Sequence, residues 1–205
     1  MTIRWAKLFV ASLAIFALAI PAYADSVDIF NFNLVKTGKS TTFSNTIKGL
    51  TATFSSPSDP GAFSVESVSS SNLKKPFTGN DLQDLGKYGA SFVPLDISFN
   101  HNVDYLFLNF ATAGSGSLEL MAYENSTLVA TVIANGTGGW DSAYGNPQGQ
   151  IELYGPIFNS VVLTSTAAQF AIDNMCTTTP EPSILLLLGT GLVGLAGAVR
   201  RRTRP

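Results

Sequence analysis

The 205-residue chain contains little cysteine, histidine and arginine, and each shortage excludes a class of site. Its one cysteine, Cys176, excludes a framework of intrachain disulfides and a zinc site built from several thiolates. Its one histidine, His101, leaves little room for a Ser-His-Asp triad or for a metal site with several histidine ligands.

Arginine is confined to the two ends of the chain. Between residues 25 and 180 the cations are six lysines, whereas the same segment holds all but one of the 14 acidic residues. Nucleic-acid binding needs clustered cations that face the phosphates. An acidic middle segment without arginine therefore argues against nucleic acid as a partner.

The first 24 residues have the three parts of an export signal. Arg4 and Lys7 give a positive start, an uncharged apolar run follows over residues 8–20, and a small-x-small site ends the segment. The run is shorter than the roughly 20 residues that a membrane-spanning helix needs, although an uncleaved anchor is the alternative. We expect signal peptidase to cut here and to leave the mature chain outside the cytoplasm. The residues of the predicted cleavage site are Ala22, Ala24 and Asp25.

Residues 177–205 have a different order of parts. A polar spacer at 177–179 leads into a Pro-Glu-Pro tripeptide, an uncharged apolar stretch follows at 184–199, and an arginine cluster ends the segment. As a helix the apolar stretch would be about 24 Å long. Arginines after such a helix stay on the cytoplasmic side, so we expect a single-pass intermediate with the middle domain outside. The marker residues are Pro180, Glu181, Pro182, Arg200, Arg201 and Arg202.

This tail resembles the PEP-CTERM sorting signal of Gram-negative bacteria. The resemblance rests on the Pro-Glu-Pro tripeptide, the glycine-rich apolar stretch and the arginines at the chain's end. It implies that an exosortase, a membrane-embedded cysteine transpeptidase-like enzyme, recognises Glu181 and its neighbours and removes the tail. It also implies release or attachment at the envelope, commonly in organisms that make exopolysaccharide. A plain C-terminal membrane anchor is the alternative.

Residues 25–176 are predicted to form one all-β domain. Short apolar stretches with β-branched and aromatic residues alternate with Gly, Pro, Asn and Ser, and no long segment has a helical period. About eleven strands with frequent turns favour a single β-sandwich of jelly-roll type. The predicted strands are 27–34, 41–47, 50–55, 62–68, 91–99, 103–111, 117–124, 127–134, 150–154, 157–165 and 169–175.

The segment 49–56 and the closing segment 170–174 are similar to the frame of galactose-binding-like jelly rolls. That resemblance implies glycan binding and a calcium ion. The chain departs from the calcium-binding members because it lacks paired acids near its start, where Asp25 and Asp28 are the nearest substitutes. Asp28 and Asp173, with loop carbonyls, are the candidate calcium ligands. Alternatively, Asp173 accepts backbone N–H bonds and fixes the last strand.

Two loops offer further candidate residues. Trp140 and Tyr144 flank Asp141 after a predicted strand, and this combination suits a glycan because sugar rings pack on aromatic rings while the acid binds hydroxyls. Alternatively, Trp140 covers one end of the sandwich. Asp81 and Asp84, in the long predicted loop 69–90, are expected to be solvated or to form a polar rim or cation site.

These signals predict an exported, exosortase-processed protein that passes through an inner-membrane intermediate to the cell envelope or the extracellular space. Its domain is expected to bind or organise exopolysaccharide without catalysis, with no cofactor apart from calcium and with membrane contact only through the terminal helices. One alternative is a structural or adhesive surface protein without a glycan site. The other is a glycoside hydrolase or lyase, since glycosidases need only two carboxylates.

Overall fold

The computed structural model describes residues 27–68, 73, 76–84, 93–137, 147–167 and 169–180. Ten strands and one short 3-10 helix lie in these ranges. Nowhere in them is there a helix with the length and apolar character needed to cross a membrane. The elements are β1 Asp28–Phe30, η1 Phe32–Leu34, β2 Phe43–Ile47, β3 Leu50–Ser55, β4 Phe63–Ser67, β5 Asn80–Asp84, β6 Leu95–Thr112, β7 Ser117–Glu124, β8 Thr127–Asn135, β9 Gln148–Ser165 and β10 Phe170–Thr178.

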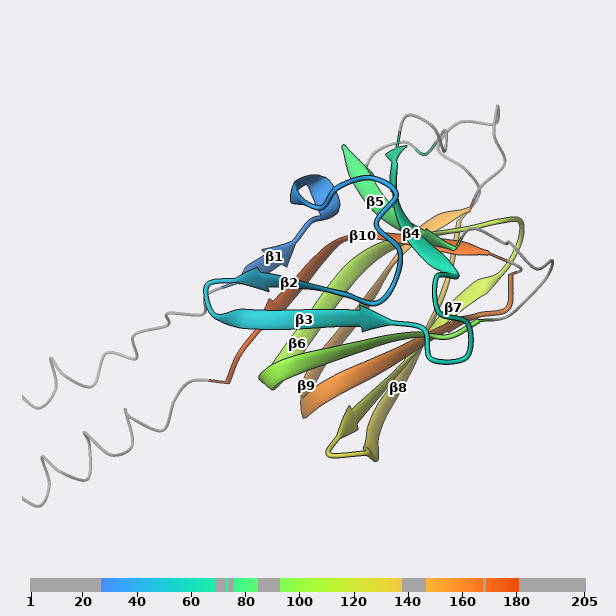
Figure 1. The fold of residues 1–205 in the computed structure, drawn as a ribbon. Coiled ribbons are helices and arrows are strands. Elements are labelled where there is room, and N and C mark those ends of the chain that lie inside the picture. The colour runs from blue at the N-terminus through green and yellow to red at the C-terminus, as the bar shows by residue number, and fades with distance from the viewer. Residues whose placement is uncertain are drawn as a thin grey trace, which may run out of the picture.

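The strands form an all-β sandwich whose two layers share the long strands β6 and β9 (Figure 1). One layer has the order β2-β3-β6-β9-β7-β8, and the other has the order β4-β5-β10-β6-β9 with β1 paired to β10. Every pairing between these strands is antiparallel. The predicted β-sandwich is confirmed.

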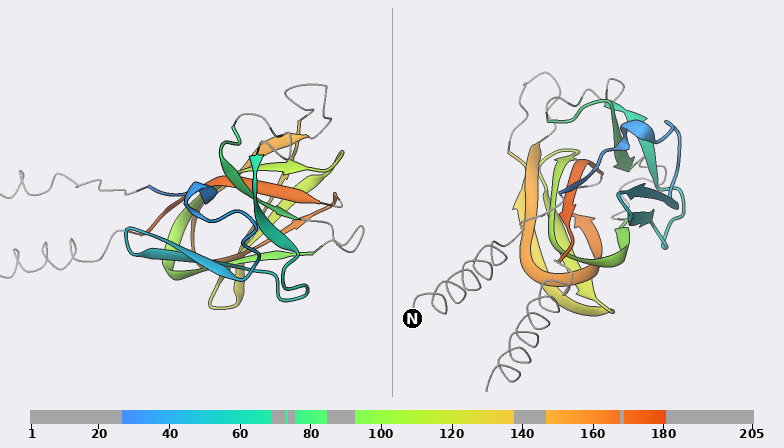
Figure 2. Two further views of the ribbon diagram at one scale, coloured as in Figure 1. Left: turned by 45° about the horizontal axis from the view of Figure 1, so that its top comes forward. Right: turned by 90° about the vertical axis from the view of Figure 1, so that its left-hand side faces the viewer.

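The strands β6 and β9 pass from one layer to the other by bending together. On β6 the register is interrupted between Ser98 and Tyr105, and on β9 Gly155 has a φ of +110° at the corresponding place. Figure 2 shows both strands curving around the core. The sequence predicted one strand on each side of each bend, and the structure joins the two into one because β6 and β9 stay paired to each other through the bend.

The predicted boundaries fail most clearly at two places. The segment 69–90 contains β5, which pairs with both β4 and β10. Its sequence, Asn-Asp-Leu-Gln-Asp, has no β-branched or aromatic residue, so it gave no strand signal. At the C-terminal end β10 runs on to Thr178, which is buried, so two of the three residues assigned to the polar spacer belong to the domain.

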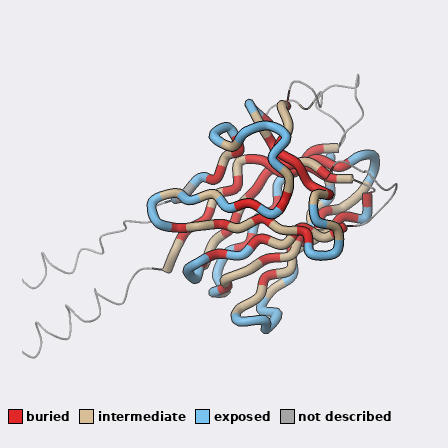
Figure 3. The backbone as a smooth tube through the Cα atoms, viewed as in Figure 1, coloured by how far each residue is buried: buried red, intermediate tan, exposed pale blue. Residues whose placement is uncertain are grey.

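The core lies between the two layers and is rich in phenylalanine. Phe32, Phe43 and Phe54 pack on one another, with ring centroids between 5.1 and 6.4 Å apart. Burial alternates along β3 and β7, and Figure 3 shows the exposed positions at turns and on β8. Each buried phenylalanine contributes about 1.5–3 kcal/mol. The packed core therefore gives the outer faces and strand ends a rigid support.

Candidate functional site

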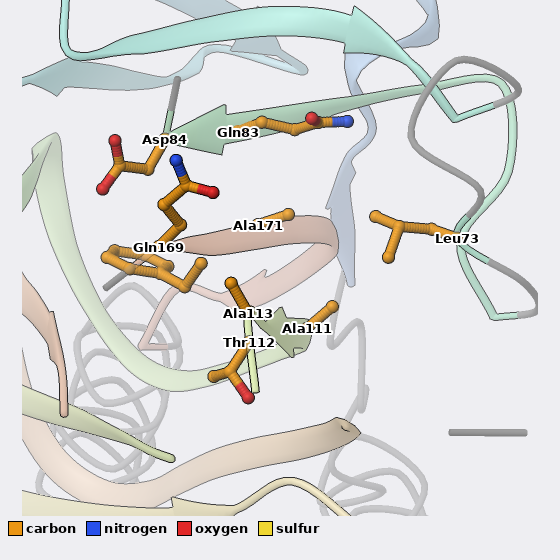
Figure 4. A pocket seen from close by; sticks show the side chains of 9 residues that line it. Leu73, Gln83, Asp84, Ala111, Thr112, Ala113, Gln169 and Ala171 are labelled. Atoms are coloured by element: carbon orange, nitrogen blue, oxygen red, sulfur yellow. The ribbon is translucent and has the colours of Figure 1, made fainter. Parts of the chain in front are cut away.

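A pocket of about 190 Å³ lies where β5 and β6 end and β10 begins (Figure 4). The space exists because the side chains that face each other across β6 and β10 are small. They are those of Ala111 and Ala171. The Ala113 N–H donates to the Gln169 carbonyl at 2.9 Å and holds the connecting segments together. The lining residues are Leu73, Gln83, Asp84, Ala111, Thr112, Ala113, Gln169, Phe170 and Ala171.

Four polar side chains belong to the described lining of this pocket. The Thr112 hydroxyl donates to the Gly114 carbonyl at 3.0 Å, and the Gln83 amide donates to Asp81 Oδ1 at 2.7 Å. Asp84 and Gln169 add a carboxylate and a carboxamide on the same side of the pocket, as Figure 4 shows. Among the described residues that line the pocket there is no lysine or arginine. A carboxylate, carboxamides and an apolar floor suit hydroxyl groups better than anions.

Two acidic side chains are completely buried beside this pocket. Asp81 on β5 and Asp173 on β10 occupy facing positions, because the ladder pairs Gln83 with Ala171 and Leu82 with Ile172. Asp173 accepts three hydrogen bonds, from the Asn174 N–H at 2.7 Å, the Asn174 side-chain amide at 3.1 Å and the Thr78 N–H at 3.1 Å. Asp173 therefore ties the segment before β5 to the last strand, which is the second of its two predicted roles.

Burial controls the protonation of both acids. It raises the pKa of Asp81 to about 7, with a smaller increase from the negative charge of Asp173 and a decrease from the hydrogen bond of Gln83. It raises the pKa of Asp173 to about 6, against the opposing effect of the Thr78 and Asn174 N–H groups. Asp81 Oδ2 has no hydrogen-bond partner among the described residues. The expectation that Asp81 and Asp84 are solvated is wrong, because both lie buried in β5.

The two candidate calcium ligands are not neighbours along the sheet. Asp28 pairs with Thr177, four residues further along β10 than Asp173, which corresponds to roughly 13 Å of strand. In the part of the chain that the structure describes, no three histidine, cysteine or acidic side chains gather as metal ligands. Calcium at Asp28 or Asp173 stays a prediction.

An exposed aromatic surface lies at the other end of the same layer. Tyr105 on β6 and Tyr154 on β9 face each other, with ring centroids 6.3 Å apart and ring planes at 66°. Tyr154 is 80% exposed. Two positions further along the ladder, on the same face of the sheet, Phe107 pairs with Glu152. We call the surface of Tyr105, Phe107, Glu152 and Tyr154 the tyrosine face.

On the tyrosine face, the surroundings of Tyr105 favour its neutral phenol. Partial burial raises the pKa of Tyr105, and so do the charge of Glu152 and its hydrogen bond with the phenol. Thr178 pairs with Tyr105 on the side opposite Tyr154, so the tyrosine face lies beside the last residue of β10. The sequence missed this surface because the segment 103–110 is apolar on both faces, which indicated a strand covered on both sides.

Several predicted residues lie outside the described part of the chain. They are the cleavage-site residues Ala22, Ala24 and Asp25, the loop residues Trp140, Asp141 and Tyr144, and the tail residues Glu181, Pro182, Arg200, Arg201 and Arg202. Cys176 was expected outside the last strand, but it lies within β10 and is partly buried.

The tail can be compared with known families once the end of β10 is fixed. Residues 178–202 match a family of protein-sorting motifs. They are a PEP-CTERM protein-sorting motif. The protein is therefore an exported exosortase substrate, which passes through a membrane-bound intermediate and reaches the cell envelope or the extracellular space. The PEP-CTERM motif begins at Thr178, the last residue of β10, so the folded domain and the motif adjoin without a long linker.

No curated protein matches the chain at a significant level. Among solved structures, the K1 cleaved adhesin domain of Lys-gingipain from Porphyromonas gingivalis W83 has 8% identity and a TM-score of 0.48, over 76% of this chain and 99% of that one. A family 6 carbohydrate-binding module has 13% identity and a TM-score of 0.36, over 75% and 94%. The catalytic domain of a GH87 alpha-1,3-glucanase has 9% identity and a TM-score of 0.37, over 76% and 28%. Likeness of this extent concerns strand arrangement and carries no functional argument.

Proposed function

We propose that the exported domain is a non-catalytic module that binds exopolysaccharide through the tyrosine face. The observation that carries this proposal is the pair Tyr105 and Tyr154, which keeps an aromatic ring 80% exposed on a rigid sheet. An exposed aromatic ring contributes a large rigid contact area at low cost in side-chain entropy. The apolar face of a sugar ring packs against such a surface, and Glu152 beside it accepts hydroxyl hydrogen bonds.

The charge around the tyrosine face supports a neutral polysaccharide as the ligand. Glu152 lies on it, Asp104 precedes Tyr105, and the domain carries far more acids than lysines. A polysaccharide rich in carboxylates or sulfates would be repelled at low salt, and screening would weaken that repulsion as salt is added.

The buried acids support a role without catalysis. A glycosidase needs two carboxyl groups that reach the glycosidic bond, one of them with a raised pKa. The acids with pKa values of about 6 and 7, Asp173 and Asp81, have no exposed surface and so cannot contact a substrate. The proposal therefore assigns them to folding.

The test compares wild type with Tyr154→Ala in a chain of residues 25–178, which contains every described strand. Pull-down on the producing organism's exopolysaccharide should fall about tenfold or more for Tyr154→Ala, because stacking of about 1.5 kcal/mol is lost. Leu34→Ala, at a 91% exposed position on η1, is the matched control and should bind like wild type. Equal retention by wild type and Tyr154→Ala would refute the role of the tyrosine face.

Repeating the pull-down with calcium and then with chelator tests the remaining calcium prediction. Retention that chelator abolishes would support a calcium-dependent module. Retention in both buffers would keep the glycan role and discard the metal.

A structural or adhesive role without a glycan site is the second candidate, and the outer face of the other layer favours it. Ser44, Thr53, Ser98 and Ser160 lie in one register row across β2, β3, β6 and β9, and Ser44 Oγ lies 2.8 Å from Thr53 Oγ1. The edge strand β8 carries no charged residue, and such edges pair readily with other strands. Self-association by wild type, together with no retention on polysaccharide, would select this candidate.

A further inference from the structure

We propose that the pocket between the ends of β5, β6 and β10 binds a single neutral sugar residue, and that the domain thereby has two polysaccharide sites and cross-links chains. The proposal that the pocket binds a sugar rests only on observations made at the pocket. The cross-linking role rests also on the proposed function of the tyrosine face.

The size of the pocket sets the size of its ligand. Its volume of about 190 Å³ corresponds to about six molecules of liquid water, which is less than the pockets that hold drug-sized ligands. A single sugar ring with its hydroxyl groups fits this scale, and a longer segment of chain does not. The pocket therefore suits a chain end or a side branch.

The chemistry of the pocket sets the class of its ligand. Asp84 is only 8% exposed and Gln169 contributes a carboxamide on the same side, so hydroxyl donors and acceptors both find partners there. Ala111, Ala113 and Ala171 provide an apolar floor for the ring carbons. The described part of the lining holds one carboxylate and no cation, so it disfavours uronic acids and other anionic sugars.

The positions of the two sites allow one domain to hold two chains. The pocket includes Thr112, at one end of β6, whereas the tyrosine face includes Tyr105, seven residues earlier on the same strand. This separation corresponds to about 23 Å. Because both sites lie on strands of one packed layer, their distance is fixed by the sheet and not by a flexible linker.

The first experiment measures sugar binding by the pocket directly. The ¹⁵N-labelled chain 25–178 is titrated with D-glucose, D-galactose, D-mannose and D-glucuronate, and the amides of Ala111, Ala113 and Ala171 are followed. We expect at least one neutral sugar to shift these amides and to bind about tenfold more tightly than glucuronate. Failure of all three neutral sugars to shift the amides overturns the proposal, whatever the tyrosine face does.

Two variants tie that binding to the pocket. Ala171→Leu fills the space and should abolish the shifts, whereas Thr131→Leu places the same side chain on the exposed strand β8 and should keep them. Gln169→Ala removes the carboxamide without adding volume, and it keeps the test decisive if Ala171→Leu fails to fold. Shifts that persist in Gln169→Ala and in folded Ala171→Leu place the sugar elsewhere and overturn the proposal.

The second experiment measures cross-linking by light scattering of exopolysaccharide mixed with the chain 25–178. Wild type should raise the scattering, and both Ala171→Leu and Tyr154→Ala should lose the increase. Ala171→Leu should still be retained in pull-down, because the tyrosine face is intact in this variant. Cross-linking by Ala171→Leu at the wild-type level would overturn the two-site role. Scattering at the wild-type level by Tyr154→Ala, with pocket amides that still respond to sugar, would refute the role of the tyrosine face and the cross-linking but not the pocket site.

Discussion

At the scale of single residues, the facing pair Asp81 and Asp173 sets how the domain responds to pH. Both pKa values are raised chiefly by burial, so the folded chain binds these protons more tightly than the unfolded chain does. Stability from a raised pKa is fully present below the unfolded value near 3.8 and is lost as pH rises through the folded value. For this pair the loss falls between pH 4 and about 7.

We expect wild type to be less stable at pH 8 than at pH 5, by on the order of 3 kcal/mol. Asp81→Asn carries no charge at either pH, so it should remove most of this difference and be the more stable chain at pH 8. Urea unfolding of both chains at the two pH values measures this. A wild type with equal stability at pH 5 and pH 8 would contradict the prediction.

Sequence reasoning anticipated the burial of Asp173 but not that of Asp81. Asp173 stood out because an acid within an apolar strand needs donors, and the structure supplies three N–H groups. Asp81 gave no such signal, since its neighbours are polar and its burial comes from pairing with a strand some 90 residues away. The tyrosine face was hidden for the same reason, because Tyr105 and Tyr154 meet only through the β6–β9 register.

At the scale of elements, the common bend of β6 and β9 organises the sandwich. Sequence reasoning located the strands on both sides of each bend, and it reproduced β3 and β7 residue for residue, because their apolar and polar residues alternate clearly. It could not show that the paired halves are continuous, because continuity depends on the partner strand. Nothing in the sequence around Gly155 indicated that its φ is +110°.

Gly155→Ala should destabilise the domain by about 1–2 kcal/mol, because a Cβ is strained at this φ. A Cβ at Gly155 would meet no atom within 4 Å, so the cost is one of backbone conformation alone. Ser160→Ala on the same strand is the control and should change stability by no more than about 0.5 kcal/mol. Thermal unfolding of wild type, Gly155→Ala and Ser160→Ala measures these differences. A Gly155→Ala chain as stable as Ser160→Ala would refute the role assigned to Gly155 in the bend.

At the scale of the whole molecule, the end of the folded domain and the start of the sorting motif coincide. The sorting signal was readable because sorting machinery recognises a short local pattern, which needs no tertiary structure. The N-terminal signal peptide stays a prediction. The boundary between tail and domain was not readable, because threonines 177–179 look like a spacer. Only their pairing with Tyr105 and Leu106 identifies two of them as strand residues.

A chain of residues 25–178 should therefore fold, whereas a chain that ends at Asn174 should be largely unfolded. The shorter chain loses the completely buried Met175 and the ladder to β1, which together are worth several kcal/mol out of a total of about 5–15. Circular dichroism and urea unfolding of the two chains measure this. Cooperative unfolding of the shorter chain with an unchanged midpoint would show that the last four residues contribute nothing.

The place of β10 has a mechanical consequence. Were the domain to bind polysaccharide as proposed, tension between the polysaccharide and the still-anchored tail would enter the domain at Thr178 and run along β10, which is paired with β6 on one side and with β5 and β1 on the other. Antiparallel ladder bonds lie across the strand, so a pull along β10 shears many of them at once and does not open them one by one. The strand that leads into the sorting tail is thus held by ladders on both of its edges.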